Sequence, residues 1–174
     1  HLVRMAGMKD RGRASTPALV ALEAAGVPFV VHEFHHEPGE RNYGKVAAEA
    51  LGVDPDRVFK TLLANLSTDR GTEPAVGIVP VSGQLSLRGL ASALGAKRAE
   101  MCPTDAAERL TGYVVGGISP FGQKKRLRTV IDEMCVLFDT VFVSGGRRGL
   151  DLEVAPDDLV RVLDAVVAPI ADTK

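Results

Sequence analysis

Apolar and polar residues alternate along the chain with two periods, one typical of helices and one typical of strands. The places where the period changes predict short helices and short strands. Residues 15 to 26 begin with Ser and Thr, place Pro in the first helical turn and end on Gly, an order typical of a capped helix. Residues 28 to 34, PFVVHEF, are instead rich in β-branched and aromatic side chains and predict a strand. Further helices are predicted over residues 43–52, 86–95, 104–112 and 156–170.

Predicted strands interleave with these helices over most of the chain. They cover residues 57–66, 75–81, 97–102, 113–115, 128–133, 140–145 and 150–154. The first two flank the turn-rich segment STDRGTEP and predict a hairpin. Because the elements lack a regular strand, helix, strand rhythm, mixed pairing is favoured over a doubly wound parallel sheet. We therefore predict an α+β fold in a single domain.

Composition narrows the class of protein only a little. The chain has 174 residues and 2 cysteines, and it has no apolar run close to the roughly 20 residues that span a bilayer. A cytoplasmic protein with reduced thiols and no membrane association is expected. Residues 1–15 are treated as an N-terminal extension, with Met5 or Met8 as the candidate native start and an origin in cloning left open. Residues 16–174 form the predicted domain.

Charge is spread unevenly, although the net charge is only −1. Residues 88–148 hold 10 Lys and Arg against 6 Asp and Glu, whereas residues 149–174 hold 2 against 6. An even distribution would argue against a nucleic-acid protein, but this one allows a basic face on a nearly neutral chain. Scattered solubilising charges explain the same counts, so the charge alone decides nothing.

The segment HEFHH, residues 32–36, matches the spacing of the zinc metalloprotease motif H-E-x-x-H. That motif works on a helix, where positions i and i+4 share a face and both imidazoles reach one zinc ion. Here the segment lies at the end of a predicted strand, on which positions four apart are separated by about 13 Å. Exposed loop histidines are therefore expected rather than a zinc site, and no metal or other cofactor is predicted.

Templates for a protein nucleophile are missing as well. The segment GGISPFG lacks the G-x-S-x-G order of a nucleophile elbow, and no histidine follows position 36 to serve Ser119 or Ser144. Neither Cys102 nor Cys135 has an adjacent histidine or a cationic sequence context, and a buried thiol is the simpler interpretation of Cys135. If the protein is an enzyme, it lacks an evident base and nucleophile.

A few residues stand out against this background. Lys60 lies in the apolar run VFKTLLANL, where the pattern favours a solvated edge-strand lysine over a cation that points into a cleft. Two glycine turns, VVGGISPFG and VSGGRRGLD, each follow a predicted strand. They either expose backbone N–H groups to a ligand or are plain turns. Asp151, just beyond Arg147 and Arg148, is expected either to pair with them or to bind a ligand.

Four segments carry a family resemblance, in this order: VFKTLLA, PVSGQLSLRGLASALGAKRAEM, TGYVVGGISPFGQKKRLRTVID and VFVSGGRRGLDLEV. They resemble the successive motifs of the YbaK-type Cys-tRNA(Pro) deacylases, free-standing relatives of the editing domain of bacterial prolyl-tRNA synthetases. The resemblance runs from about Thr16 to Asp172. It implies an α+β fold around a mixed, barrel-like sheet with short helices packed around it. It also implies metal-free chemistry on tRNA(Pro) that is mischarged with cysteine.

The resemblance assigns roles to particular residues. Catalytic roles fall on Lys60, which would position the 3′ end of the tRNA, and on Gly116 and Gly117, whose N–H groups would stabilise an oxyanion. Substrate-binding roles fall on Phe34, Tyr43, Thr61, Ile118, Ser119, Pro120, Ser144 and Asp151. Four cations after the glycines are candidates for contact with tRNA phosphates or simply with solvent: Lys124, Lys125, Arg126 and Arg128.

One departure from the family pattern concerns its aromatic positions. The relatives place a tyrosine where this chain has Phe34, and a phenylalanine is common where Tyr43 stands. Aromatic side chains near loops, among them Phe121, can stack on a base such as the terminal adenosine, although packing is the more common role. Any role for the first hydroxyl is lost in this chain.

The resemblance also implies a mechanism that needs no protein nucleophile. In this family the cysteine thiol of the substrate attacks its own ester and releases tRNA and a thiolactone. Three alternatives stay open: an editing hydrolase for another small aminoacyl group such as alanine, a non-catalytic module that binds tRNA or a synthetase, and the disfavoured zinc hydrolase. Prolyl-tRNA synthetase is a candidate partner, and the oligomeric state is open.

Overall fold

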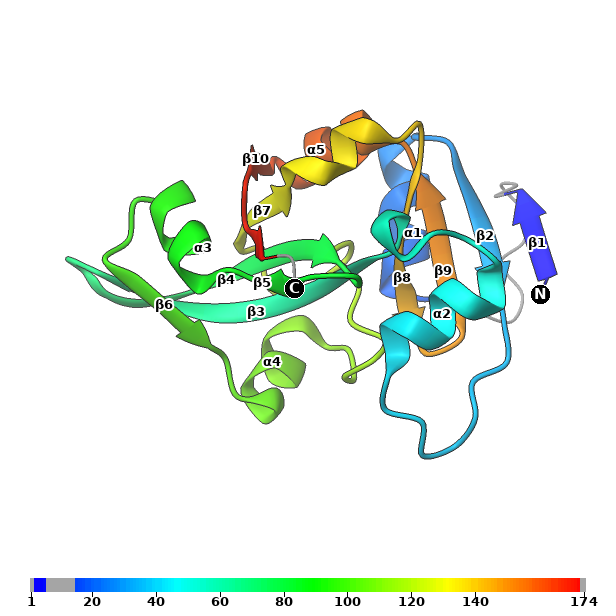
Figure 1. Cartoon of the computed structure of the whole chain (residues 1–174), viewed down its shortest axis with the longest axis horizontal. Coiled ribbons are helices and arrows are strands. Elements are labelled where there is room, and N and C mark those ends of the chain that lie inside the picture. Colours follow the sequence, from blue (N-terminus) through cyan, green and yellow to red (C-terminus); the bar gives the residue numbers. More distant parts are fainter. Residues whose placement is uncertain (1, 6–14, 173–174) are drawn as a thin grey trace.

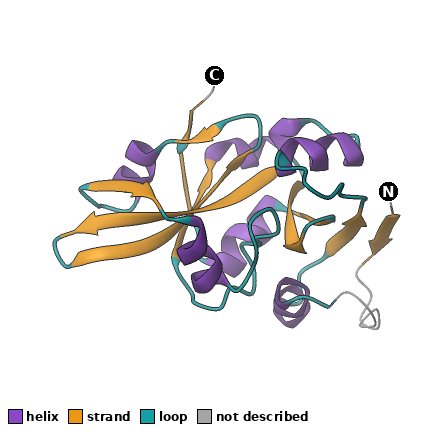
Figure 2. Cartoon of the chain, turned by 90° about the horizontal axis from the view of Figure 1, so that it is seen from below, coloured by secondary structure: helices purple, strands orange, loops and turns teal. Residues whose placement is uncertain are grey.

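The computed structural model describes residues 2–5 and 15–172, which form five α-helices, two short 3-10 helices and eleven strands (Figures 1 and 2). The helices are α1 (Pro17–Ala25), α2 (Tyr43–Leu51), η1 (Pro55–Arg57), α3 (Leu87–Ala93), α4 (Thr104–Thr111), η2 (Glu133–Leu137) and α5 (Pro156–Leu163). The strands are β1 (Leu2–Met5), β2 (Phe29–Glu33), β3 (Phe59–Thr68), β4 (Gly71–Pro80), β5 (Gln84–Leu85), β6 (Arg98–Met101), β7 (Arg128–Asp132), β8 (Val141–Arg147), β9 (Leu150–Val154), β10 (Val166–Ala168) and β11 (Ala171–Asp172). Within these ranges, no helix is long and apolar enough to cross a membrane.

The strands are arranged in three sheets. Sheet A has the order β1-β2-β9-β8, sheet B the order β10-β7-β4-β3-β6, and β11 pairs with β5 in a small third sheet. In Figure 1, sheet B lies on the left and sheet A on the right. Strands β3 and β4 form the predicted antiparallel hairpin, whereas β7 runs parallel to β4 and β10 parallel to β7. The predicted α+β fold with mixed strand pairing is confirmed, and the described sheets stay open instead of closing into a barrel.

Helix α1 shows how local sequence sets the ends of an element. The Thr16 hydroxyl accepts a hydrogen bond from the Leu19 N–H (3.2 Å) and donates one to the Gly145 carbonyl of β8 (2.5 Å). Gly26 ends the helix in the left-handed region at φ 71°. The helix predicted from these capping residues is confirmed, and its first cap also fastens it to sheet A.

The helix predicted over residues 156–170 is wrong in its second half. Helix α5 ends at Leu163, and Asp164 turns the chain at φ 51°. Val166 then pairs with Val130 of β7 and begins β10, because β-branched side chains suit a pleated sheet edge better than a helix. The two-residue strands β5 and β11 were too short for the pattern to predict.

No strand forms over residues 113–115, so the first glycine turn does not follow a strand as predicted. Residues 113–127 instead make an irregular loop between α4 and β7, referred to below as the glycine loop. The buried Tyr113 hydroxyl donates to the Phe121 carbonyl (2.7 Å), and burial raises the pKa of Tyr113 to about 12. At Gly122, φ is 65° and the backbone of Pro17 leaves no room for a side chain. The glycine loop is therefore packed against the body of the protein.

Sheet A has an apolar face and a polar face across β2, β9 and β8. Two successive rows of register partners show this: an apolar row, Val31, Leu152 and Val143, and a polar row, His32, Asp151 and Ser144. The apolar row lies in the main hydrophobic core together with α1 and α5. Because neighbouring residues of a strand point to opposite faces, the polar row faces away from that core. A smaller apolar cluster of α2, Val58 and Phe142 covers part of the polar face.

Strand β1 pairs antiparallel with β2, so residues 2–5 extend sheet A. These residues belong to the predicted N-terminal extension. Residues 1 and 6–14 of that extension lie outside the described residues.

Candidate active site

A cavity of about 380 Å³ opens between sheet A, strand β3 and the glycine loop. Its lining includes seven of the residues that the family resemblance implies: Tyr43, Lys60, Thr61, Gly116, Ile118, Ser144 and Asp151. These residues come from α2, β3, the glycine loop, β8 and β9, so segments far apart in the chain meet here. The apolar part of the lining includes Phe59, Leu63, Met101, Cys102 and Ala107. The cavity is large enough for a small aminoacyl group.

Lys60 and Thr61 border the cavity where β3 has only one neighbouring strand. Strand β3 pairs with β4 along its length but with β6 only at residues 64–67, so its edge at Lys60 faces the cavity. The interpretation of Lys60 as a solvated edge-strand lysine is therefore wrong, since the residue is half-buried and lines the cavity. The Thr61 hydroxyl is buried and has no hydrogen-bond partner in the described chain. It is available to a ligand.

Asp151 and Ser144 bring the polar row of sheet A into the cavity wall. Asp151 is only 7% exposed, and burial raises the pKa of its carboxyl to about 7. Such a carboxyl changes its charge within the neutral range and can bind a cation or move a proton. Ser144 accepts a hydrogen bond from the Gly146 N–H (3.1 Å), at an irregularity in the pairing of β8 with β9.

The expected pairing of Asp151 with Arg147 and Arg148 does not occur. Arg147 instead lies 3.4 Å from the Glu33 carboxylate, and Arg148 donates to the Val115 carbonyl (2.9 Å). Arg147 ends β8 and Arg148 lies in the turn that follows, where both are at least partly accessible to solvent, whereas Asp151 is buried in β9. The cavity carboxyl is therefore not neutralised by its neighbours in sequence.

Tyr43, at the start of α2, is held by three other segments. Its ring stacks on His36 with 5.3 Å between ring centroids, and the Arg148 guanidinium lies 4.8 Å from its centroid. A Cβ atom at Gly116 would approach the same ring to 2.6 Å, and Gly116 has φ 87°, so only glycine fits there. The protein itself thus packs around Tyr43. Stacking of a terminal adenosine on this ring requires His36 or Arg148 to move.

Gly117 is placed differently from Gly116. Its N–H donates to the Val114 carbonyl (2.9 Å) within the glycine loop, and it does not line the cavity. A Cβ atom here would come within 2.8 Å of the Arg147 backbone. Gly117 allows close packing of the loop on the β8–β9 turn, and its N–H is already used, so the oxyanion role that the resemblance implies fits Gly116 better.

Ser119 and Pro120 are buried inside the glycine loop and do not line the cavity. The Ser119 hydroxyl accepts a hydrogen bond from the Phe121 N–H (3.2 Å), and its carbonyl accepts one from the Gln123 side chain (3.0 Å). These contacts shape the loop that carries Gly116 and leave the serine inside it. In this structure, the two residues support the site without contacting the cavity.

Phe34 lies outside the cavity lining and packs against the apolar cluster beside α2. This position corresponds to packing, the more common role of an aromatic side chain near a loop.

The four predicted phosphate contacts also lie away from the cavity lining. Lys124, Lys125 and Arg126 are exposed on the glycine loop. Arg128 donates to both carboxylate oxygens of Glu73 (2.7 and 3.2 Å), and this hydrogen bonding lowers the pKa of the Glu73 carboxyl. Arg128 is exposed like the other three cations, but Glu73 engages its guanidinium within the fold.

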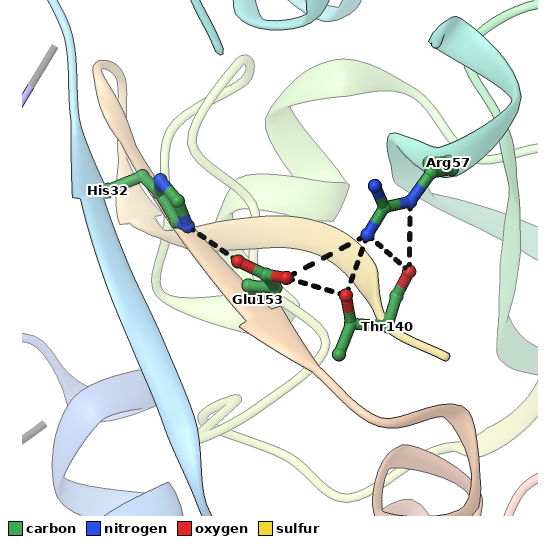
Figure 3. Close-up of polar contacts among 4 residues, drawn as sticks. All are labelled: His32, Arg57, Thr140 and Glu153. Atoms are coloured by element: carbon green, nitrogen blue, oxygen red, sulfur yellow. Dashed lines mark hydrogen bonds and ion pairs between the residues drawn. The ribbon is translucent and has the colours of Figure 1, made fainter. Parts of the chain in front are cut away.

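A partly buried polar network lies next to Asp151, and the sequence pattern did not predict it (Figure 3). His32 of β2 contacts the Glu153 carboxylate of β9 (2.9 Å), and the Thr140 hydroxyl donates to the same carboxylate (2.6 Å). Arg57 donates to the Thr140 hydroxyl (2.7 Å) and approaches Glu153 at 3.7 Å. The sequence does place a polar residue, His32 or Glu153, at an alternating position of each predicted strand. It does not show that the two meet, because they lie 121 positions apart in the chain.

The three histidines of HEFHH have separate environments. His32 is buried, so the expectation of an exposed loop histidine is wrong for it. His35 is exposed and lies 3.0 Å from Glu37, whereas His36 packs on Tyr43. Within residues 2–5 and 15–172, no group of three or more His, Cys, Asp or Glu could hold a metal ion.

Neither cysteine has the environment of an activated thiol. Burial, followed by the charge of Asp105, raises the pKa of Cys102, which lines the cavity. Burial raises the pKa of Cys135 to about 11. Both thiols are therefore protonated at neutral pH.

The family model described as "Aminoacyl-tRNA editing domain" matches residues 37–162, a range that contains every residue lining the cavity. The chain belongs to the aminoacyl-tRNA editing domain family. It is accordingly an aminoacyl-tRNA deacylase, an enzyme that cleaves the ester between an amino acid and its tRNA.

Two curated relatives of this editing domain differ in the amino acid that their names give. The chain is 33% identical over 162 residues to "Putative Cys-tRNA(Pro)/Cys-tRNA(Cys) deacylase EbsC" of Enterococcus faecalis, which covers 93% of this chain and 96% of that protein. It is 26% identical over 148 residues to "Multifunctional Ser/Thr-tRNA deacylase ProXp-y" of Escherichia coli, with 83% and 84% covered. The relatives agree on the reaction class and differ on the aminoacyl group.

Solved structures show the same editing-domain fold. The hypothetical protein APE2540 superposes with a TM-score of 0.79 at 24% identity, covering 90% of this chain and 100% of that one. A "putative trans-editing enzyme for prolyl tRNA synthetase" superposes with a TM-score of 0.75 at 23% identity, covering 92% and 99%. The family resemblance of the four sequence motifs is thus confirmed, and so is the fold that it implied.

Proposed function

We propose that this editing-domain enzyme clears cysteine from mischarged tRNA(Pro), and that the thiol of the bound cysteine attacks its own ester. The observation that carries this proposal is the lining of the cavity. It holds polar binding groups, but in the described chain it includes no histidine to activate a protein nucleophile. The Cys102 thiol in the lining is held protonated by burial. The relative named for Cys-tRNA deacylation supports the choice of cysteine.

In the proposed reaction, the cysteinyl sulfur forms a bond to its own carbonyl carbon. The bond between that carbon and the 3′ oxygen of the tRNA breaks, and the thiol proton ends on the departing oxygen. The products are free tRNA and a four-membered thiolactone, which water then opens to cysteine. Holding the thiol against the ester is a proximity effect, and orientation of this kind supplies about 7 kcal/mol or more.

Four cavity residues have roles in this proposal. Lys60 binds phosphate or ribose at the 3′ end of the tRNA, and the Thr61 hydroxyl, which has no partner in the described chain, bonds to the aminoacyl group. The Gly116 N–H stabilises the oxyanion that develops on the ester carbonyl, a contribution of about 3 kcal/mol in comparable sites. Asp151, in its ionised form, binds the α-ammonium group of the amino acid.

A second candidate is hydrolysis of another small aminoacyl ester by water. The specific observation in its favour is Asp151, because a buried carboxyl with a pKa of about 7 is well matched to a general base at neutral pH. The relative named for Ser/Thr-tRNA deacylation supports the same alternative.

The identity of the product separates the two candidates. The enzyme is incubated with tRNA(Pro) charged with cysteine, serine, alanine or proline. After the reaction is quenched, the released product is identified as thiolactone or free amino acid. Self-attack predicts thiolactone and a large preference for cysteine, since a hydroxyl is a poorer nucleophile than a thiol. Free serine released as fast as cysteine would contradict self-attack and favour hydrolysis.

The role of Lys60 has its own test. We expect Lys60→Ala to lower kcat/KM for Cys-tRNA(Pro) by about 100-fold, because a charged contact to the substrate is lost. Lys97→Ala is the matched control, since Lys97 pairs with Asp69 on the surface and does not line the cavity. Turnover by Lys60→Ala close to that of the control would remove the lysine from the mechanism.

Selection of tRNA(Pro) is part of the same proposal. Three exposed cations of the glycine loop, Lys124, Lys125 and Arg126, are the candidates for contact with tRNA phosphates. Prolyl-tRNA synthetase is the proposed partner that would add tRNA selectivity. Deacylation measured with and without the synthetase, over a range of salt concentrations, tests both contributions.

A further inference from the structure

The polar row of sheet A continues beyond the cavity. Asp151 is its central member, with Ser144 as its register partner in β8 and His32 as its register partner in β2. Directly opposed residues of antiparallel strands point to the same face, with Cβ atoms about 5 Å apart. Ser144 and Asp151 line the cavity, whereas the buried His32 does not. His32 therefore lies beside Asp151 on the side away from Ser144.

Glu153 lies on the same face of β9 as Asp151, two residues further on. One of its carboxylate oxygens contacts His32 (2.9 Å), and the other accepts from Thr140 (2.6 Å) and lies 3.7 Å from Arg57 (Figure 3). Burial raises the pKa of Glu153, but the hydrogen bonds from Thr140 and His32 and the charge of Arg57 outweigh it and lower the pKa overall. Glu153 is thus an anion at neutral pH.

The two carboxyl groups on this face have opposite environments. Glu153 is surrounded by donors, whereas burial alone raises the pKa of Asp151 to about 7. The ionised Glu153 requires a proton on Nε2 of His32, so that nitrogen is the donor in their hydrogen bond. The imidazole is also packed edge-on against Phe142, with 5.1 Å between ring centroids. Two contacts therefore direct His32 toward Glu153.

The charged groups around Asp151 belong to several elements. His32 and Glu153 flank it within sheet A, Arg57 extends from η1 and contacts Glu153, and Lys60 and Arg41 line the same cavity. Of the nearby hydrogen-bond donors, Glu153 engages the His32 imidazole (2.9 Å), whereas three hydrogen bonds hold Arg57 on the carbonyl and hydroxyl oxygens of Thr140. A buried carboxylate that no cation neutralises interacts strongly with the next cation to arrive.

We propose that Glu153 is a positioning residue that directs the His32 imidazole away from Asp151 and leaves the Asp151 carboxylate for the positively charged amino group of the substrate. This inference rests on the role of Asp151 in the proposed function. It adds that the carboxyl two residues away sets how strongly Asp151 binds. Glu153 contacts no substrate and acts through His32.

The test begins with Glu153→Gln, which preserves shape and removes the negative charge. The Nε2–H of His32 then loses its ionised acceptor and can donate to Asp151, and a hydrogen bond to the ionised form lowers the pKa of a carboxyl. We expect the midpoint of the Asp151 titration, followed by carbon-13 NMR of the free enzyme, to fall by about 1 pH unit. We also expect KM for Cys-tRNA(Pro) to rise about 10-fold with a smaller change in kcat.

Two further variants complete the design. In the double variant Glu153→Gln, His32→Phe, a ring without a hydrogen-bond donor replaces the imidazole, so the Asp151 midpoint is expected to return toward the wild-type value. Glu33→Gln is the control, because Glu33 is a β2 carboxylate on the opposite face and pairs with Arg147. The control should leave the Asp151 midpoint unchanged.

The result that overturns the inference is a Glu153→Gln protein that is less stable but titrates Asp151 at the wild-type midpoint, which would make the network purely structural. The NMR titration uses no substrate, so it stands even if the proposed reaction fails. Failure of the proposed function shows separately, as an Asp151→Asn enzyme with wild-type kcat/KM.

Discussion

The apolar and polar rows of sheet A lie on the same strands with the same antiparallel pairing, yet one row packs in the core and the other reaches the cavity wall. In the apolar row, Leu152 is fully buried in the main core. One residue earlier on β9, Asp151 is also buried, but it lines the cavity with a carboxyl whose pKa burial raises to about 7. The two side chains differ in the face of the sheet that they occupy and hardly in their exposure.

Burial of a side chain therefore has two different energetic effects in this enzyme. On the core face, removal from water stabilises the fold by roughly 25 cal/mol for each Å² of apolar surface. On the cavity face, the same removal destabilises an ionised carboxylate and makes it a stronger partner for a cationic ligand. The two rows should therefore respond to substitution in opposite ways.

The largest expected effect is on the apolar row. Leu152→Ala leaves a cavity in the core and should lower the free energy of unfolding by about 2–5 kcal/mol. Urea unfolding measures this loss, and kcat/KM per folded molecule should stay within about 3-fold of the wild type because the cavity face is not altered. A fully stable but inactive variant would show that the rows are not independent.

Asp151→Asn should have the complementary effect on the polar row. The variant loses the charge that we propose binds the α-ammonium group, so kcat/KM for Cys-tRNA(Pro) is expected to fall by about 100-fold. The free energy of unfolding at pH 8 should not fall, since a buried ionised group is removed. Asp158→Asn, which breaks a pair with Arg161 on α5, is the control for a change of charge alone.

The pH dependence of stability tests the same difference between the polar and apolar rows. The pKa of Asp151 is about 7 in the folded protein, against a usual 3.8, so the folded state binds a proton that the unfolded state has released between these values. The contribution of Asp151 to stability is therefore full below about pH 4 and is lost as pH rises through 7, with a slope of about 1 kcal/mol per pH unit. Unfolding measured from pH 5 to 8 should show this slope in the wild type and in Leu152→Ala. Its persistence in Asp151→Asn would assign the slope to another group.

The smallest effect is expected for Ser144→Ala. The hydroxyl accepts one hydrogen bond, from the Gly146 N–H, so its loss should lower the free energy of unfolding by about 1 kcal/mol. Activity should fall about 5-fold, because the polar row keeps its carboxyl. If this variant were as inactive as Asp151→Asn, the serine would share the central role in the row.

Local signals predicted those parts of the fold that depend on neighbouring residues. The caps at Thr16 and Gly26 predicted α1, and the alternating residues around STDRGTEP predicted the β3–β4 hairpin. The C-terminal helix was predicted too long because its second half pairs with β7, a contact that periodicity does not reveal. The strand before Gly116 was wrong for a similar reason, since burial of Tyr113 and Phe121 shapes an irregular loop there.

The candidate site shows the same limit. The motif resemblance pointed to residues that do meet at the cavity, such as Lys60 and Asp151, although the pattern alone favoured a solvated Lys60. It did not distinguish Gly116, which lines the cavity, from Gly117, whose N–H is used within the loop. The contact between His32 and Glu153 depends on the register of β2 with β9, and composition and spacing carry no information about that register.

The pairing of β2 with β9 has a consequence for the newly made protein. Proteins are synthesised from the N-terminus, and a strand cannot pair before its partner exists. Strand β8 directly precedes β9, but His32 meets Asp151 and Glu153 only when β9 pairs with the much earlier β2, and His32 and Glu153 are 121 positions apart. A ribosome-bound chain that stops before β9 can hold Lys60 and the glycine loop but not the carboxyl of the cavity. The wall of the cavity is therefore complete only after β9 has paired with β2.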